Sequence, residues 1–183
     1  MNRIYALVGM CGSGKSVACE HFQKRGWDFV YFGGVTMDEL KKRGLEKNEA
    51  NERKVREELR ATYGPAAFAI LLLPVIEEKL KKGSVVLDGL YSWSEYKVLE
   101  ERFGDALKLI AIIADKHIRY DRLTRREIRP LTPEQAKSRD KAEIENLEKG
   151  GPIAVADYFV MNNGSIEETN AMLDAIIDAA KEN

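Results

Sequence analysis

The feature that most constrains this chain is an eight-residue motif near its start, Gly9-Met-Cys-Gly-Ser-Gly-Lys15-Ser16, which matches G-x-x-x-x-G-K-[ST] in full. Residues 3–9 form a β-rich run, and residues 16–25 form a helix-length stretch that Gly26 ends. A loop between such a strand and helix turns backbone N–H groups inward at a helix N-terminus, where they bind a polyphosphate. A glycine-rich turn followed by a chance Lys-Ser pair is the alternative. The full motif in this context favours a phosphate-binding loop.

Each position of this loop has an expected task. Lys15 supplies a point charge for the β- and γ-phosphates, and the Ser16 hydroxyl coordinates Mg²⁺. The other expected nucleotide contacts come from the loop, mainly through its backbone: Gly9, Cys11, Gly12, Ser13 and Gly14. We interpret the Cys11 side chain as steric filler, although a helix N-terminus can lower a thiol pKa.

Asp88 is the candidate acidic partner of the loop. It ends the apolar run Val85-Val-Leu-Asp88, which is typical of a buried strand. Ligands of α/β sheets gather at the carboxyl ends of the strands, so Asp88 and Gly9 are expected to face one crevice. There Asp88 would hold Mg²⁺ through water. The alternative is that Asp88 only starts a turn with Gly89.

Strand-like and helix-like segments alternate along the chain. The expected strands are residues 3–9, 27–32, 84–88, 107–114 and 157–161. The expected helices are residues 16–25, 38–43, 49–63, 66–82, 92–103, 116–127, 132–149 and 165–181. Capping-box spacing marks four helix starts, at Thr36, Ser92, Thr132 and Ser165. This alternation predicts an α/β three-layer P-loop NTPase fold, with a mostly parallel sheet and helices on both faces, in a single domain over residues 1–183.

Composition excludes several other classes of protein. With 44% hydrophobic and 32% charged residues among 183, the chain is neither disordered nor a repeat array. A net charge of −1 gives no global field for nucleic acid or an anionic membrane. The longest apolar run, residues 66–76, is about half of a membrane span. No secretory signal is expected, and two cysteines make no disulfide framework, so we expect a cytoplasmic location.

Arginines crowd a segment that we call the lid, residues 119–141: Arg119, Arg122, Arg125, Arg126, Arg129 and Arg139. One interpretation is a mobile flap that places cations on phosphates and excludes water. A second is a solvated, salt-bridged face, and we expect Arg119 to be such a surface residue. A third, a nucleic-acid patch, is disfavoured because Tyr120 is the only aromatic residue there.

These residues together resemble a known family. The loop, Leu87-Asp88-Gly89, the Arg122/Arg126 pair and Val155-Ala-Asp157 with Asn162-Asn-Gly164-Ser are similar to P-loop kinases of small phosphorylated metabolites. The chain is most similar to dephospho-coenzyme A kinase and to adenylate-kinase-related proteins. The resemblance implies a five-stranded parallel sheet, an arginine lid, and ATP with Mg²⁺ as phosphoryl donor. It also implies that Arg122 contacts the nucleotide, that Arg126 and Arg139 touch the transferring phosphates, and that Asn163-Gly164 packs against adenine.

The acceptor side, about residues 33–82, departs from that family. Dephospho-coenzyme A kinases carry Asp-x-Asp after the second strand, with an Arg nearby, whereas this chain has Gly33, Gly34 and Met37 there. Related proteins often carry Arg shortly after the Asp-Gly, where this chain has Tyr91. Arg53 and Arg60 could clamp an acceptor phosphate or form a salt-bridged helix face.

Three functions compete at this point. The leading hypothesis is ATP-dependent phosphoryl transfer to a small phosphorylated or nucleoside-type acceptor, without nucleic acid or membrane as a partner. The second is an ATP-binding regulatory module with weak or no transfer. The third, a GTPase switch, lacks a guanine motif, because Asp115-Lys-His follows the strand over residues 107–114.

Overall fold

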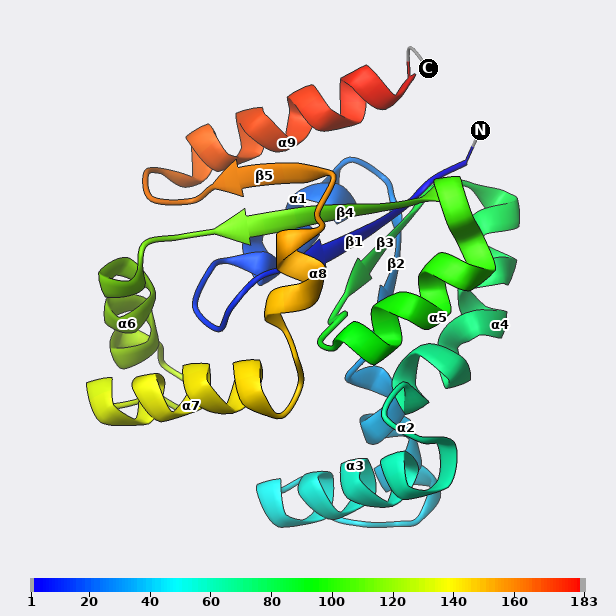
Figure 1. Ribbon diagram of the computed structural model, residues 1–183, viewed down its shortest axis with the longest axis vertical. Helices are drawn as coiled ribbons and strands as arrows, with labels where there is room; N and C mark the ends of the chain where they lie inside the picture. The colour runs from blue at the N-terminus through cyan, green and yellow to red at the C-terminus, as the bar shows by residue number, and fades with distance from the viewer. Residues whose placement is uncertain (1, 182–183) are drawn as a thin grey trace.

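The computed structural model describes residues 2–181 and contains a five-stranded sheet, drawn in Figure 1. The strands are β1 (Ile4–Val8), β2 (Asp28–Tyr31), β3 (Val85–Asp88), β4 (Leu107–Ile113) and β5 (Tyr158–Met161). Their order is β2-β3-β1-β4-β5, and every neighbouring pair is parallel. The chain runs from β1 out to β2, returns through β3 and then continues on the far side of β1. This confirms the expected five-stranded parallel sheet.

Helices cover both faces of the sheet, which explains the apolar composition of its strands. Every residue of β1 is buried, and its side chains alternate between two core clusters. Ile4 and Ala6 pack with α4 (Ala67–Lys82) and α5 (Trp93–Phe103). Tyr5 and Leu7 pack with α1 (Lys15–Lys24) and α9 (Ile166–Lys181). The expected three-layer arrangement is therefore confirmed.

Two pairs of helices extend beyond the carboxyl ends of the strands (Figure 1). One pair is α2 (Gly34–Lys42) and α3 (Glu49–Tyr63), and the other is α6 (Lys116–Arg125) and α7 (Pro133–Glu145). After α7, the short α8 (Gly150–Ala154) contacts α5 and β4. A 3₁₀ turn at Gly104–Ala106 precedes β4. The helix expected over residues 132–149 is therefore shorter in the structure, because α7 ends at Glu145 and residues 146–149 are not helical.

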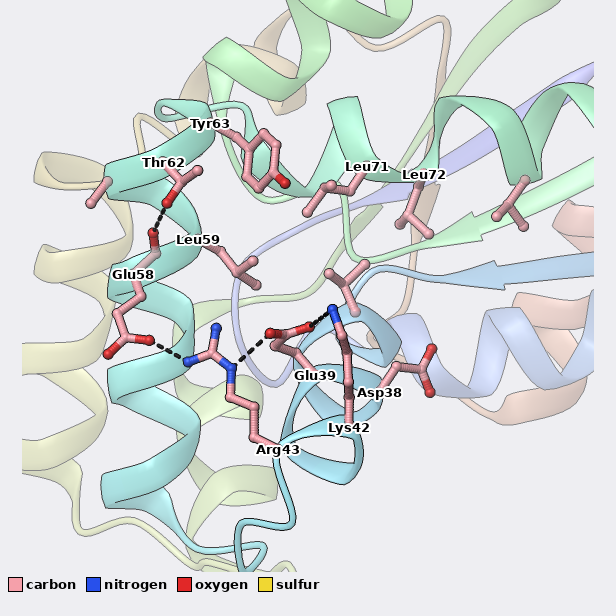
Figure 2. A pocket seen from close by; sticks show the side chains of 13 residues that line it. Asp38, Glu39, Lys42, Arg43, Glu58, Leu59, Thr62, Tyr63, Leu71 and Leu72 are labelled. Atoms are coloured by element: carbon pink, nitrogen blue, oxygen red, sulfur yellow. Dashed lines mark hydrogen bonds and ion pairs between the residues drawn. The ribbon is translucent and has the colours of Figure 1, made fainter.

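An arginine ties α2 to α3. Arg43, at the end of α2, donates to Glu39 at 2.7 Å and also pairs with Glu58 of α3. Figure 2 shows these contacts in a cavity of about 740 Å³ that is lined by α2, α3 and α4. Leu59 and Leu72 line its apolar side. The pair α2–α3 is therefore held both by ion pairs and by packing on α4.

Three of the four expected helix caps are present, and one is wrong. Ser92 accepts from the Glu95 N–H at 3.1 Å, and the Glu95 carboxylate accepts from the Ser92 N–H at 3.2 Å. Thr132 and Ser165 make the equivalent contacts. Thr36 does not cap a helix, because α2 already begins at Gly34. Its hydroxyl is instead buried and has no hydrogen-bond partner among the residues that the structure describes.

Within residues 2–181, no single helix is both long and apolar enough to cross a membrane. Only α3 and α4 taken together, across a bend of 83°, have the required length and composition. Several side chains of α4, including Ala67, Phe68 and Ile76, are buried in the core of this fold.

Candidate functional site

The loop between β1 and α1 has the backbone shape of an anion cradle. Gly9 has φ +148°, and a Cβ there would lie 2.4 Å from the Ile112 carbonyl oxygen. Gly14, the N-cap of α1, has φ +98°, and a Cβ there would lie 2.0 Å from Nδ2 of Asn162. That same amide donates to the Ser13 carbonyl at 2.8 Å. Both glycines are therefore required, and Asn162, which directly follows β5, holds the loop through its side-chain amide.

The helix N-terminus and Lys15 supply the hydrogen-bond donors and the positive charge of the loop. The first N–H groups of a helix have no intrahelical partner, and the N-cap Gly14 offers no side chain to satisfy them in α1. Lys15 donates its Nζ to the carbonyls of Gly9 at 2.7 Å and Met10 at 3.2 Å. Burial, followed by the charge of Lys149, lowers the pKa of Lys15 to about 8. Ser16 is exposed at the start of α1.

Asp88 lies beside this loop. Parallel pairing aligns it with Leu7 of β1 on one side and with Tyr31 of β2 on the other. The carboxyl group is half-buried, and burial raises its pKa while the charge of Lys15 lowers it. The structure thus brings Asp88 and the loop to the same edge of the sheet.

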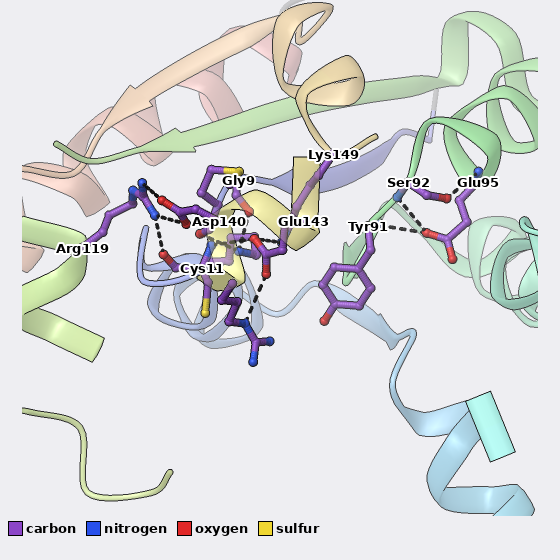
Figure 3. Close-up of polar contacts among 12 residues, drawn as sticks. Gly9, Cys11, Tyr91, Ser92, Glu95, Arg119, Asp140, Glu143 and Lys149 are labelled. Atoms are coloured by element: carbon purple, nitrogen blue, oxygen red, sulfur yellow. Dashed lines mark hydrogen bonds and ion pairs between the residues drawn. The ribbon is translucent and has the colours of Figure 1, made fainter. Parts of the chain in front are cut away.

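Arg119 clamps the tip of the loop, which corrects the expectation that it is a surface residue. Its side chain is 9% exposed, and Nη1 donates to the Cys11 carbonyl at 3.0 Å. Its two terminal nitrogens also donate to the Asp140 carboxylate at 2.8 and 2.7 Å. Arg119 therefore connects α6, α7 and the loop, as Figure 3 shows.

A second buried ion pair touches the same loop residue. The Glu143 carboxylate accepts from the Cys11 N–H at 3.1 Å and pairs with Lys149 at 2.9 Å. These two side chains are 9% and 3% exposed. Burial raises the pKa of Glu143, but Lys149 and the Cys11 N–H outweigh it and leave that pKa below its ordinary value. Glu143 is therefore held as a carboxylate against the loop.

Sequence reasoning missed Asp140, Glu143 and Lys149. One signal was available, because Ala136, Asp140 and Glu143 recur at intervals of four and three residues on a single face of α7. That face carries small and acidic residues, so the sequence lacks the apolar stripe that normally marks the buried face of a helix. The spacing by itself therefore does not indicate burial.

The other residues predicted for the site are Arg122, Arg126, Arg139 and the pair Asn163-Gly164, and their present hydrogen-bond partners differ. Arg122 donates Nη2 to the Asn162 carbonyl at 2.9 Å, and its buried Nη1 has no hydrogen-bond partner in the described part of the chain. Arg126 instead donates to the carbonyl of Arg129. Asn163 accepts from the Asp115 N–H at 2.8 Å in the exposed turn that also holds Gly164. Arg139 donates to Glu143 at 3.4 Å, which places it near the loop.

A cavity of about 410 Å³ opens beside Glu143 and Arg139. Its walls come from the end of β2, from α2, α3, α4 and α7, and from single residues outside these elements: Tyr31, Phe32, Gly33, Thr36, Met37, Glu49, Glu52, Arg56, Arg60, Phe68, Tyr91, Arg129, Arg139, Glu143 and Leu147. It includes Gly33, Met37 and Tyr91, the positions where the sequence departs from dephospho-coenzyme A kinases.

One cation in this cavity has no carboxylate partner. Arg56 and Arg129 both pair with Glu49 and Glu52 at 2.9 to 3.4 Å. Among the described residues no ion pair joins Arg60, whose guanidinium lies 5.1 Å from the centre of the Phe68 ring. Burial lowers the pKa of Arg60, and the charge of Glu95 opposes this.

Comparison with known proteins identifies the family. A family model described as an AAA domain matches residues 6–159. A UPF0200 protein of Thermococcus kodakarensis is 36% identical over 179 residues, or 96% of each chain. TT1252 from Thermus thermophilus has a TM-score of 0.69 at 20% identity, and dephospho-CoA kinase from Campylobacter jejuni has 0.55 at 18%; each match covers 97% of both chains. These structures confirm the P-loop kinase-like fold. The chain therefore belongs to the AAA domain family, and its full-length relatives include UPF0200 proteins.

Proposed function

We propose that this protein transfers the γ-phosphoryl group of ATP to a small anionic acceptor. The observation that carries the proposal is a juxtaposition: two residues that line the cavity, Glu143 and Tyr31, contact the phosphate loop at Cys11 and pair with Asp88, respectively. The same cavity contains Arg60, a cation that has no carboxylate partner within residues 2–181. During transfer, the acceptor oxygen bonds to the γ-phosphorus, and the bond from that phosphorus to the β–γ bridging oxygen breaks. ADP is the second product.

The donor side follows from the loop. The N–H groups at the start of α1 bind the phosphates, and Lys15 exchanges its contacts with the Gly9 and Met10 carbonyls for phosphate oxygens. The Ser16 hydroxyl and the Asp88 carboxylate are oxygen donors that suit Mg²⁺, which is commonly held by one or two carboxylates together with substrate phosphates. When bound, Mg²⁺ neutralises charge on those phosphates.

The lid, residues 119–141, closes this site. Arg139 already lies near the loop, and we propose that it and Arg126 contact the transferring phosphoryl group. Arg126 must first leave the Arg129 carbonyl, because its guanidinium is held there now. Arg122 donates to the Asn162 carbonyl, directly before the turn at Asn163 and Gly164, and we place the nucleoside part of ATP at this turn.

The acceptor cavity favours an anion attached to a ring or an apolar group. Within residues 2–181, Arg60 supplies a cation without a carboxylate partner, and the buried Thr36 hydroxyl has no hydrogen-bond partner. A phosphate or carboxylate would satisfy both, and buried polar groups of this kind are normally satisfied. Phe68 and Tyr91 offer aromatic surface to the rest of the molecule. A volume of about 410 Å³ is that of a typical small-molecule site.

Paired acceptors test this proposal. The protein is incubated with Mg·ATP and one of AMP, adenosine, CMP, cytidine or dephospho-coenzyme A, and ADP is measured by chromatography. We expect ADP with an anionic acceptor and far less with its neutral counterpart. Lys15→Ala should abolish it, and Arg60→Gln should raise KM for the acceptor about tenfold or more. Arg53→Gln is the matched control, because Arg53 lies on the same helix with 72% of its side chain exposed.

The regulatory-module alternative gives a different result. It predicts that ATP binds, that Lys15→Ala weakens this binding, and that no acceptor produces ADP. Transfer that occurs equally well in Arg60→Gln and wild type would support a kinase but contradict the acceptor site assigned to this cavity.

A further inference from the structure

The Glu143 carboxylate lies where an oxyanion of the ligand would be expected. It accepts from the Cys11 N–H, an amide of the phosphate loop, and it faces cations on both sides. One is Lys149 at 2.9 Å, which Figure 3 labels. The other is Arg139 at 3.4 Å. A backbone amide, an ammonium and a guanidinium are the groups that bind phosphate oxygens elsewhere in proteins.

Lys149 is buried to a degree that is unusual for lysine. The residue is 2% exposed and lies 5.2 Å from the centre of the Tyr91 ring. Among the described residues, Glu143 is its one carboxylate partner within 4.0 Å. A buried cation is costly unless an anion accompanies it. Lys149 therefore needs an anion at this position, whether from Glu143 or from a ligand.

Lys149 and Lys15 also act on each other. After burial, the charge of Lys149 is the largest influence that lowers the pKa of Lys15, and Glu143 opposes it. Both ammonium groups lie at this loop: Lys15 donates to the Gly9 and Met10 carbonyls, and Lys149 pairs with the Glu143 carboxylate that accepts from the Cys11 N–H. A phosphate group carries more negative charge than a carboxylate, so it would offset the repulsion between the lysines more fully.

We propose that Glu143 occupies a phosphate position in the nucleotide-free chain, and that Lys149 is a second phosphate-binding lysine. When a polyphosphate binds, the Cys11 N–H and the Lys149 ammonium pass from Glu143 to phosphate oxygens. Because Glu143 lies on α7, its release also frees that helix from the loop at this contact. The inference rests on the proposed binding of a polyphosphate by the loop, but it is independent of the acceptor and of transfer.

Calorimetric titration with inorganic pyrophosphate tests it. Glu143→Gln keeps the shape of the side chain and removes the competing charge, so we expect pyrophosphate to bind about tenfold or more tightly than to wild type. Lys149→Met should weaken binding by about tenfold or more. The matched controls Lys141→Met and Glu145→Gln alter an exposed i,i+4 pair on α7 and should leave the affinity unchanged.

A spectroscopic measurement on the wild type keeps the test independent of variant folding. The backbone amide resonance of Cys11 in ¹⁵N-labelled protein should shift as pyrophosphate is added, with the Kd that calorimetry gives. If Glu143 only supports the loop, Glu143→Gln binds pyrophosphate as weakly as wild type or more weakly, and the inference is overturned. An unmoved Cys11 resonance, or an unchanged affinity in Lys149→Met, also overturns it. If neither the wild type nor Glu143→Gln binds pyrophosphate at all, both this inference and the proposed function are contradicted.

Discussion

Replacing Arg119 by alanine should destabilise the protein far more than removing any exposed arginine of the same helix. The substitution deletes both hydrogen bonds to Asp140 and the one to the Cys11 carbonyl. It leaves the Asp140 carboxylate, whose side chain is 15% exposed, without its cation. An uncompensated buried charge, rather than the lost pairing itself, then dominates the effect on the free energy of unfolding.

The expected magnitude is about 3 kcal/mol. Breaking a buried ion pair from one side costs about 3–5 kcal/mol. The lower end applies here because Asp140 keeps a hydrogen bond from the Tyr120 hydroxyl at 3.2 Å and some contact with solvent. For a chain of this size, the melting temperature should fall by about 2–4 °C for each kcal/mol.

Urea unfolding followed by circular dichroism measures this difference. The matched control is Arg125→Ala on the same helix, where Arg125 is 78% exposed and pairs with Asp121 at 2.8 Å. That change should cost less than about 1 kcal/mol. Removing both partners, in Arg119→Ala with Asp140→Ala, should recover part of the stability because no lone charge remains. If Arg119→Ala and Arg125→Ala are equally stable, the assigned clamp is wrong.

Three further predictions concern catalysis and pH. Asp88→Asn should lower activity far more than ATP affinity at every Mg²⁺ concentration; equal activity of variant and wild type in a magnesium titration would exclude the metal role. Arg126→Ala or Arg139→Ala should each lower kcat by about 10³-fold with little change in ATP affinity, whereas Arg125→Ala should leave kcat unchanged. Steady-state kinetics of the three variants show whether Arg126 and Arg139 act on the phosphates or are ordinary surface arginines. Burial raises the pKa of Glu95 from 4.5 to about 7, so the folded chain binds this proton more tightly than the unfolded chain does. The free energy of unfolding should therefore fall by roughly 3 kcal/mol as the pH rises from 4.5 to 7. Glu95→Gln should remove this pH dependence, which urea unfolding measures.

The sequence alone determined the phosphate loop and the architecture around it. The motif from Gly9 to Ser16 needs only backbone conformation and the helix that follows, and both are local properties. The strands were predictable because parallel strands are buried on both faces and read as near-continuous apolar runs, as over Leu107–Ile113, where Lys108 is the one polar residue. The caps at Ser92 and Thr132 were predictable because their partners lie three residues away.

The tertiary structure alone decided which charged residues are buried. Arg119 and Arg125 lie on one helix in similar sequence surroundings, yet the first is buried and the second is exposed. The bonds that distinguish them span the chain: Arg119 reaches Cys11 across 108 residues, and Glu143 reaches it across 132. Local patterns of polarity report the average exposure of a segment, whereas the cost of burying a charge depends on the partner that the fold brings to it. For this reason the loop could be found from its sequence, and the residues that hold it could be found only from its surroundings.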